Sequence, residues 1–311
     1  LLPFHAACHF NTVATAKYLY NLYPESINVN VATTRGAYPI HFTIGTIEER
    51  SNPATAVEIV QFLLDCDPDV VLQKHQDEFP LYWVCVEATN DNNTDRLNAC
   101  LKVLQILYDA HPDAIEDNEI ISNLGEFCAE IQTFLNTQLT YARQARDRTL
   151  MNTRDENGQL PLHKALRDDV TLYDNITLGS IKLLVKGNPS AINCADNSGM
   201  IPLHVACQHH DSNSIVEYLL DLDPSTSRAL DFDDNTVLHY ACRDANHAII
   251  SLLLDKYGSM SVSKRNAHGQ LPIDLLLLQS KNGMNDKESV EYTESIYRLL
   301  RANPETIINS I

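Results

Sequence analysis

The sequence is poor in positive charge and has no glycine-rich phosphate loop. In 311 residues it carries 23 Lys and Arg against 41 Asp and Glu, which gives a formal net charge of -18. Nucleic acids and anionic membranes attract proteins with clustered positive charge, so we expect neither as the main partner. The ten glycines lie singly, and none forms the G-x-x-x-x-G-K pattern that binds phosphates. The acidic balance favours a basic or mixed-charge protein as the partner.

Long apolar runs and closely paired cysteines are also missing. No apolar stretch approaches the ~20 residues that a membrane span needs, and no secretory signal is visible. The eight cysteines include no C-x-x-C pair of the kind that binds zinc or forms a redox disulfide. We therefore expect reduced thiols and a protein that is intracellular, located in the cytoplasm.

What the sequence does contain is a repeated motif. Its three best copies span 155–165, 196–207 and 231–242, and each runs on into an apolar block that ends in a leucine pair. His163 and His204 occupy equivalent positions 41 residues apart, and His204 and His239 are 35 residues apart. A nearly fixed period of this length is typical of solenoids, in which each unit packs on its neighbours.

The residues of the motif suit a turn that is followed by the start of a helix. Asp155 can accept hydrogen bonds from nearby backbone N–H groups, and Gly158 tolerates a positive φ angle. Pro161 suits the first turn of a helix, where its missing N–H costs nothing. The small Ala165, two residues after the motif His, allows two helices to approach closely. Each copy therefore predicts a turn, a short helix, a loop and a longer helix.

This unit resembles the ankyrin repeat, which has about 33 residues, a turn, two helices and a Thr-Pro-Leu-His-x-Ala core. Residues 236–241, Thr-Val-Leu-His-Tyr-Ala, come closest to that core. The resemblance implies an all-α ankyrin-repeat solenoid, with helix-turn-helix repeats joined by short hairpin turns and motif histidines that hydrogen-bond the backbone between repeats. Second helices close with a Pro instead of the family's usual Gly-Ala. That feature and the segment 139–169 resemble the ankyrin-repeat proteins expanded in diatoms and related algae.

Seven repeats can be identified along the chain. Residues 1–112 hold repeats one to three, and residues 155–311 hold repeats four to seven. The intervening 113–154 lack the motif but have helical composition, which predicts a degenerate repeat or a helical insert packed on the stack. Because the chain begins at Leu1 inside a motif, we expect a fragment of a longer protein, whose targeting segment could lie outside it.

No grouping of residues predicts catalysis or a bound metal. His204, Cys207, His209 and His210 lie close in sequence, but His204 and Cys207 recur at equivalent places in other repeats and so have a structural explanation. A free thiol at such a repeated helical position acts as a small buried hydrophobe. The cysteines at this position are Cys8, Cys85, Cys207 and Cys242. We expect no enzyme activity, no catalytic residue, no cofactor and no metal.

The resemblance implies protein binding through hairpin tips and first helices. The partner-binding tip residues that it predicts, all outside the core, are Glu156, Asn157, Gln159, Asn197, Ser198, Met200, Phe232, Asp233 and Asn235. The matching residues of the first helices are Arg167, Asp168, Gln208, His209, Arg243 and Asp244. The function implied is that of a monomeric scaffold or adaptor for an unidentified protein. The alternative is a regulatory or substrate-recruiting region of a larger enzyme whose catalytic domain lies outside this chain.

Overall fold

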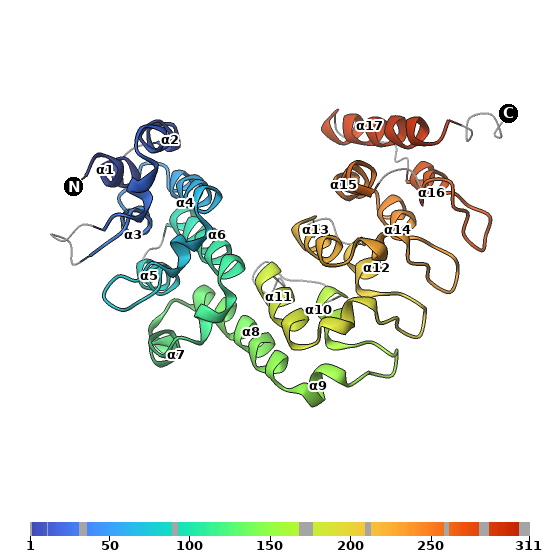
Figure 1. The fold of residues 1–311 in the computed structure, drawn as a ribbon, viewed down its shortest axis with the longest axis horizontal. Helices are drawn as coiled ribbons and strands as arrows, with labels where there is room; N and C mark the ends of the chain where they lie inside the picture. The colour runs from blue at the N-terminus through green and yellow to red at the C-terminus, as the bar shows by residue number, and fades with distance from the viewer. Residues whose placement is uncertain are drawn as a thin grey trace. The chain divides into compact units, whose positions relative to one another are not determined.

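The described residues of each recognisable repeat form a short first helix and then a longer second helix, in the order that the motif predicts (Figure 1). The computed structural model describes residues 2–10, 12–30, 36–88, 93–167, 177–208, 213–257, 261–279 and 286–304. Within these residues the chain is helical and forms no β-strand, so the expected all-α fold is confirmed. Contacts divide the chain into unit 1, Leu1–Arg143 with Val170–Leu183, and unit 2, Gln144–Asp169 with Leu184–Ile311.

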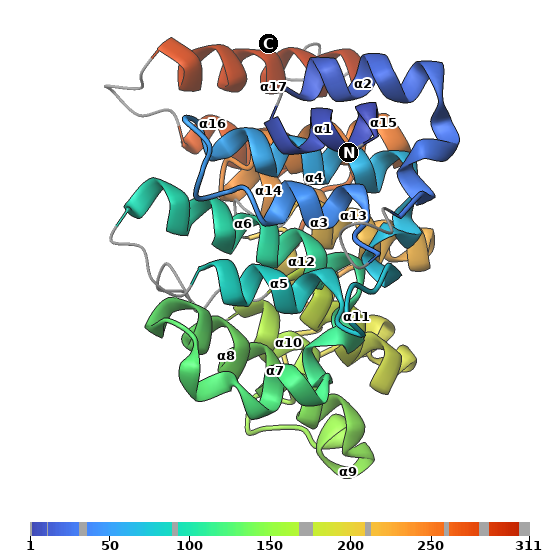
Figure 2. The same cartoon turned by 90° about the vertical axis from the view of Figure 1, so that its left-hand side faces the viewer.

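Unit 1 contains repeats one to three as two layers of helices. The first helices are α1 (Pro3–Phe10), α3 (Pro39–Ile44) and α5 (Pro80–Glu87). The second helices are α2 (Val13–Leu22), α4 (Ala54–Cys66) and α6 (Thr94–Ala110). Each helix packs on the next helix of its own layer, as Figure 2 shows for the first helices. A row of equivalent first helices therefore lies along one face of this unit.

The segment without the motif also forms helices. It contains α7 (Asn118–Ser122), η5 (Leu124–Glu126), α8 (Ala129–Arg146) and α9 (Arg148–Asn152). Phe134 of α8 meets Tyr108 of α6 edge to face, with ring centroids 5.8 Å apart. Gln138 of α8 accepts a hydrogen bond from Ser180, which lies on α11 (Leu178–Gly187). In unit 1, α8 therefore occupies the place of a second helix, while the predicted domain boundaries after 112 and 154 remain predictions.

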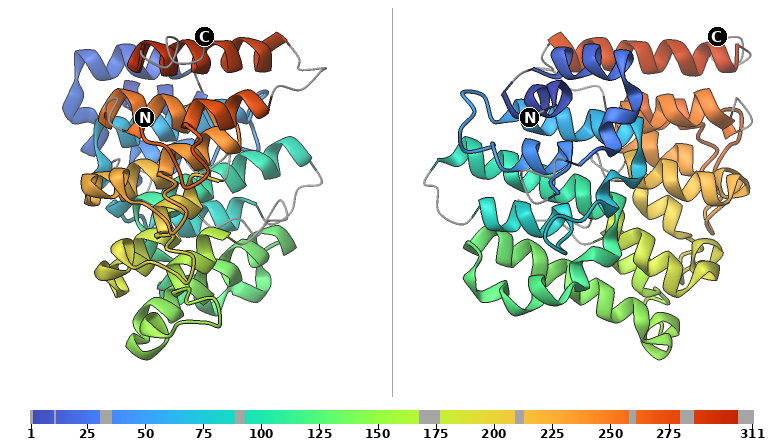
Figure 3. Two further views of the ribbon diagram at one scale, coloured as in Figure 1. Left: turned by 90° about the vertical axis from the view of Figure 1, so that its right-hand side faces the viewer. Right: turned by 60° about the vertical axis from the view of Figure 1, so that its left-hand side comes forward.

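Unit 2 contains the first helices of repeats four to seven and the second helices of repeats five to seven, in the same two layers. Its first helices are α10 (Pro161–Arg167), α12 (Pro202–Ala206), α14 (Val237–Arg243) and α16 (Pro272–Leu278). After the end of α11, its second helices are α13 (Asn213–Leu222), α15 (His247–Tyr257) and α17 (Asp286–Ala302). The hairpin tips of this unit follow one another along its stack (Figure 3).

Five second helices are followed by a proline that starts a 3-10 helix. These are η1 (Pro24–Asn28), η3 (Pro68–Leu72), η4 (Pro112–Glu116), η6 (Pro189–Asn193) and η7 (Pro224–Arg228). Proline cannot donate to the ladder of an α-helix, so it ends the helix, and its fixed φ angle suits the first position of a new turn. The closing prolines seen in the sequence thus mark a junction with the same local structure in each of these repeats.

The motif histidines connect neighbouring repeats, as the resemblance implies. Each imidazole accepts at Nδ1 from the backbone N–H three residues before it, which places its own proton on Nε2. That Nε2 then donates to a backbone carbonyl of the next repeat. The bonds join His163 to Met200 (3.1 Å), His204 to Ala229 (3.2 Å) and His239 to Gln270 (3.2 Å). Burial lowers the pKa of all three imidazoles and so favours the neutral form that this pairing needs.

The hairpin tips of unit 2 stack through backbone hydrogen bonds. In each tip a turn Asp or Asn accepts from the N–H groups two and four residues later, as Asp196 does from Ser198 (2.8 Å) and Met200 (3.0 Å). One N–H···O=C bond joins each tip to the next. These bonds run from Asn197 to Asn157 (3.0 Å), from Phe232 to Ser198 (3.0 Å) and from Ala267 to Asp233 (2.7 Å). Gly199 allows this approach, because a Cβ there would lie 2.6 Å from the backbone N of Phe232.

Small side chains fill the space between the helices. Ala165, Ala206 and Ala241 are buried, as are the four cysteines of the repeated position, Cys8, Cys85, Cys207 and Cys242. Burial raises the pKa of the Cys8 thiol to about 12 and also raises the pKa of the other three thiols. A thiol with a raised pKa is a weak nucleophile at neutral pH, so these cysteines are suited to packing.

A carboxylate of α6 holds the start of α11 in unit 1. The backbone N–H of Gly179 donates to Oδ1 of Asp109 at 2.6 Å, and Nζ of Lys182 donates to the backbone carbonyl of Asp109 at 2.7 Å. Burial nevertheless raises the pKa of Asp109 to about 6, well above the value of about 3.9 for a free side chain. The folded chain therefore binds this proton more tightly than the unfolded chain does.

Removing a motif imidazole should destabilise the stack. We expect His204→Ala and His239→Ala each to lower the free energy of unfolding by about 1–3 kcal/mol, because each leaves buried backbone groups without a partner. Urea unfolding followed by circular dichroism measures the loss. His268→Ala is the control, since His268 is exposed at a hairpin tip. Unfolding curves of both core variants that match wild type would contradict the inter-repeat role.

Alanine substitutions at two glycines can distinguish the cost of backbone strain from the cost of a collision between hairpin tips. Gly199 and Gly269 have φ angles of 80° and 76°, so alanine at either position costs about 1–2 kcal/mol. A Cβ on Gly199 would also collide with the backbone of Phe232, whereas nothing lies within 4 Å of a Cβ on Gly269. We expect Gly199→Ala to destabilise the chain by about 1 kcal/mol more than Gly269→Ala in urea unfolding. Equal losses would mean that the tips do not pack in this way.

The raised pKa of Asp109 predicts a dependence of stability on pH. Because the folded pKa lies above the unfolded one, this group lowers the free energy of unfolding as the pH rises from about 4 to about 6, and the loss persists at higher pH. Relative to wild type, we expect Asp109→Asn to gain about 2 kcal/mol more at about pH 7.5 than at about pH 4.5. Asp69→Asn, at an exposed carboxylate, is the control in these unfolding measurements. A gain from Asp109→Asn that is the same at both pH values would contradict the raised pKa.

Candidate functional site

The tips of unit 2 present an exposed aromatic ring beside carboxylates. The side chain of Phe232 is 77% exposed, more than any other large apolar side chain in the described part of the chain. Asp233 and Asp234 follow it in the same tip and are also exposed, and Asp234 lies 4.0 Å from the ammonium of Lys264. Aromatic side chains with polar surroundings are frequent energetic centres of protein interfaces. This tip can therefore offer both an apolar anchor and negative charge.

Most of the predicted tip residues lie on the surface. Glu156, Asn157, Asn197, Ser198, Phe232 and Asp233 are exposed, and Asn235 is half-buried. Part of their polar capacity is used within the stack, since Nδ2 of Asn197 donates to the carbonyl of Glu156 at 3.0 Å. The amide of Asn235 likewise donates to Asp231 at 2.9 Å and accepts from Asn266 at 2.9 Å. The side chains left for a partner are chiefly Glu156, Phe232 and Asp233.

Two predicted tip residues are in the core instead. Gln159 is 3% exposed and Met200 is 5% exposed, so their expected placement outside the core is wrong. Both directly follow the glycine of their turn, where the chain runs back toward the first helix. Nε2 of Gln159 donates to Oδ2 of Asp196 at 3.3 Å, and the carbonyl of Met200 accepts from His163. The side chain of Gln159 and the backbone of Met200 therefore join repeats, and neither side chain is exposed to a partner.

The predicted first-helix residues that the structure describes all lie at least partly on the surface. Arg167 and Arg243 are exposed, and Gln208 and Asp244 are half-buried, while Asp168 and His209 lie outside the described residues. Arg243 and Asp244 form an ion pair at 3.1 Å, and the guanidinium of Arg243 lies 4.6 Å from the ring centre of Tyr240. This pair largely neutralises itself, so it offers a partner less charge than its two residues suggest.

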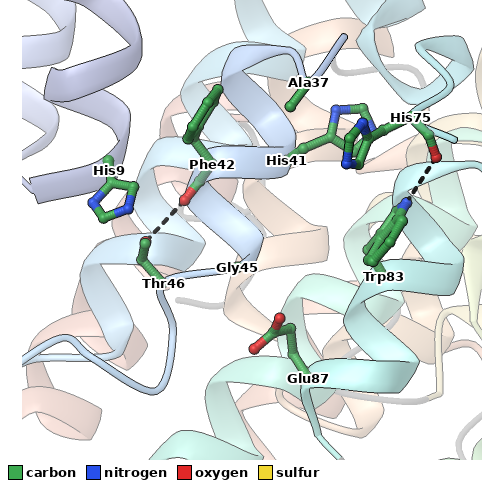
Figure 4. A pocket seen from close by; sticks show the side chains of 9 residues that line it. All are labelled: His9, Ala37, His41, Phe42, Gly45, Thr46, His75, Trp83 and Glu87. Carbon is green, nitrogen blue, oxygen red and sulfur yellow. Dashed lines mark hydrogen bonds between the residues drawn. The ribbon is translucent and has the colours of Figure 1, made fainter. Parts of the chain in front are cut away.

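A second candidate site lies in unit 1, on the row of first helices of repeats one to three. It is a pocket of about 240 Å³. The pocket is lined by His9, Ala37, His41, Phe42, Gly45, Thr46, His75, Trp83 and Glu87 (Figure 4). These residues come from α1, α3 and α5, from the hairpins before α3 and α5, and from the turn after α3, which holds Gly45 and Thr46. The pocket therefore depends on the packing of three consecutive repeats.

Aromatic rings form one wall of this pocket. The rings of His41 and His75 have centroids 5.3 Å apart, and those of His75 and Trp83 are 5.1 Å apart. The indole Nε1 of Trp83 donates to the backbone carbonyl of His75 at 3.2 Å, which fixes the plane of the indole (Figure 4). Phe42 lies on α3 on the opposite side, with its ring 6.1 Å from that of His9. The pocket is thus shaped by flat rings held by their own contacts.

The motif contact is incomplete beside this pocket. His41 accepts at Nδ1 from the backbone N–H of Tyr38 at 3.2 Å, as His163, His204 and His239 do from their own helix starts. Its Nε2 is buried and has no hydrogen-bond partner among the described residues, although the carbonyl of Gln73 lies near enough to raise the pKa somewhat. Burial and then the neighbouring His75 outweigh that effect and lower the pKa of His41 to about 3. The imidazole is therefore neutral at physiological pH.

The charged group of the pocket is Glu87. Its pKa is raised, first by burial and then by the negative charges of Glu48 and Glu49. In the described part of the chain, no Lys or Arg forms an ion pair with this carboxylate. The pocket thus combines aromatic walls with a carboxylate that forms no ion pair among the described residues.

Sequence reasoning did not find this pocket. The motif copies that match one another best lie in repeats four to six, and the predicted site residues were therefore placed there. One signal was present, since Trp83 is the single tryptophan of the chain and stands next to Tyr82, which replaces the motif His of repeat three. His9 and His75 also lie outside the motif position. Side chains that depart from a repeat pattern were therefore the better indication of a site.

Neither a membrane span nor a metal centre was found in the residues described here. No helix among them is both long enough and apolar enough to cross a bilayer. The same residues hold no group of three or more His, Cys, Asp or Glu side chains that could coordinate an ion. His209 and His210 lie outside the described residues.

Several curated proteins share about a third of their residues with parts of this chain. The human SMC5-SMC6 complex localization factor protein 1 is 35% identical over 86 residues, which are 28% of this chain and 8% of that protein. Human inversin is 34% identical over 107 residues, 33% of this chain and 9% of that protein. A probable serine/threonine-protein kinase of Dictyostelium discoideum is 32% identical over 123 residues, 38% of this chain and 14% of that protein. The matches thus span only about a tenth of these relatives.

A family model also matches the chain. The model for ankyrin repeats matches residues 137–229 and 173–266. These ranges include the clearest motifs, the histidines that join repeats and the stacked hairpin tips. The helix pairs of unit 1 follow the same order, with the same proline junctions. The resemblance to the group from diatoms and related algae is not tested by these matches. The chain contains ankyrin repeats, which the family model matches within residues 137–266.

Proposed function

We propose that the chain is a scaffold or adaptor that binds a partner protein through the hairpin tips and first helices of repeats four to six. Ankyrin repeats are generally protein-interaction modules. The observation that carries the proposal is the exposed ring of Phe232 beside the carboxylates of Asp233 and Asp234. An exposed aromatic side chain gains free energy when a partner covers it, and the neighbouring charges select the partner.

The proposed partner is a protein with a basic surface, bound by a monomer of this chain in the cytoplasm. The net charge of -18 favours such a partner over nucleic acid or an anionic membrane. One relative, the human SMC5-SMC6 complex localization factor protein 1, is named for localizing a complex. No catalytic residue, cofactor or metal takes part in this proposal.

A second candidate is that these repeats regulate an enzyme or recruit its substrate, with the catalytic domain elsewhere in a longer protein. One relative supports it, because the matched region is 14% of a probable serine/threonine-protein kinase. The sequence of the full open reading frame distinguishes the two proposals. A catalytic domain in the same open reading frame would favour the second.

The tips can be tested with variants of the whole chain. A partner is first captured with the wild-type chain, and its association is then measured by surface plasmon resonance at several salt concentrations. We expect Phe232→Ala to weaken binding at least about tenfold, as loss of a buried aromatic anchor does. Glu156→Gln with Asp233→Asn should slow association and reduce its salt dependence, because electrostatic steering acts on the association rate.

The control is a matched pair of charges on α17. Glu291→Gln with Glu294→Gln removes the same charge from exposed positions far along the sequence from the tips. This control should leave both the affinity and the salt dependence unchanged. If the tip variants and the control pair behave alike while all of them melt like wild type, the tips do not form the binding surface.

A further inference from the structure

We infer that the pocket of unit 1 receives an arginine side chain of a partner protein. This site does not involve the tips of unit 2. The carboxylate of Glu87 lines this pocket together with Phe42 and Trp83 (Figure 4), and burial and the charges of Glu48 and Glu49 raise its pKa. Three carboxylates near one another repel, and a cation placed among them relieves that repulsion. A positively charged group is therefore the ligand for which the site has most to gain.

The described residues of the chain do not supply that cation themselves. Arg50 is next to Glu48 and Glu49 in sequence, but it is half-buried and donates through Nη2 to the backbone carbonyl of Cys8. Its guanidinium is therefore held at α1. Access to Glu87 is left open by Gly45, since an added Cβ there would lie 3.8 Å from Oε1 of Glu87. A ligand can reach the carboxylate where position 45 has no side chain.

The aromatic walls favour arginine over other cations. The indole of Trp83 lies on one side of the pocket and the ring of Phe42 on the other (Figure 4). A guanidinium is planar and weakly hydrated, so it stacks on such rings and pairs with a carboxylate through two parallel N–H groups. A lysine ammonium is a more strongly hydrated point charge and gains less from a flat wall.

The size and charge of the pocket argue against other ligands. Its volume of about 240 Å³ is below the ~300 Å³ at which pockets for drug-sized molecules begin, so one long side chain suits it. Phosphate and nucleic acid would be repelled by Glu87, Glu48 and Glu49. A metal ion would need several ligands, and the described residues hold no such group. A side chain delivered by a protein is the occupant that agrees with all of these features.

The single tryptophan makes the site directly measurable. Because Trp83 is the only Trp of the 311-residue chain and lines the pocket, its fluorescence reports this site alone. The probes are three blocked pentapeptides, Gly-Gly-Arg-Gly-Gly and the same peptide with Lys or with citrulline in place of Arg. Citrulline keeps the shape of arginine but has no charge. All titrations use the whole chain.

We expect the Arg peptide to change the fluorescence of Trp83 in a saturable way at millimolar concentration or below. The citrulline and Lys peptides should need at least about five times more peptide for half-saturation. Glu87→Gln should weaken the Arg peptide by a similar factor and abolish its advantage over citrulline. Glu291→Gln, at an exposed carboxylate of unit 2 that does not line the pocket, is the control and should bind the Arg peptide like wild type.

A second variant, Gly45→Leu, tests the inference independently in case Glu87→Gln misfolds. Gly45 has an ordinary φ angle of -65°, so Gly45→Leu is compatible with the backbone and should fill the approach to Glu87 while keeping its charge. It should also weaken the Arg peptide, with a melt like that of wild type. No saturable change of Trp83 fluorescence, or equal half-saturation for Arg, Lys and citrulline, would overturn the inference. Neither result bears on the tips of unit 2, which are tested by Phe232→Ala and the tip charges.

Discussion

The neutral imidazole of the motif histidine is the contact on which the stack depends. One ring accepts from the start of its own helix and donates to the hairpin of the next repeat, so it sets the helix start and the spacing between repeats together. Only the neutral form can do both, and burial favours that form. The same burial makes protonation costly, so a fall in pH acts on every one of these contacts at once.

The two candidate sites occur where the repeat pattern leaves positions free. In unit 2 the backbone of the tips is committed to the ladder between repeats, and the side chains that remain outside it include Phe232 and Asp233. In unit 1 the pocket lies where the motif contact is incomplete, since the Nε2 of His41 has no hydrogen-bond partner among the described residues and Tyr82 replaces the next motif His. Side chains at such positions do not join neighbouring repeats, so they can contact a partner.

The sequence was sufficient for the fold, because the motif is a set of local rules. The turn Asp and the glycine of positive φ predicted the hairpin turns, and the proline predicted the helix starts. The resemblance to ankyrin repeats implied the contact of the histidine, which is also present. It was not sufficient for the sites. Gln159 and Met200 follow the turn glycine, and only the course of the chain after that glycine shows that they point inward. The pocket of unit 1 needed three repeats to be packed before Trp83, Phe42 and Glu87 could be seen to share it.

The ladder between hairpin tips also has an evolutionary consequence. Every bond in it joins a residue to the next repeat along the chain and to no other, as Phe232 is joined to Ser198. A gene segment that encodes one whole repeat can therefore be duplicated or lost while the two flanking surfaces still match. Insertions within a repeat are tolerated in its loops, but a change at the turn disturbs two neighbours together. Chains of this kind are thus expected to evolve in length by whole repeats and in specificity by single tip residues.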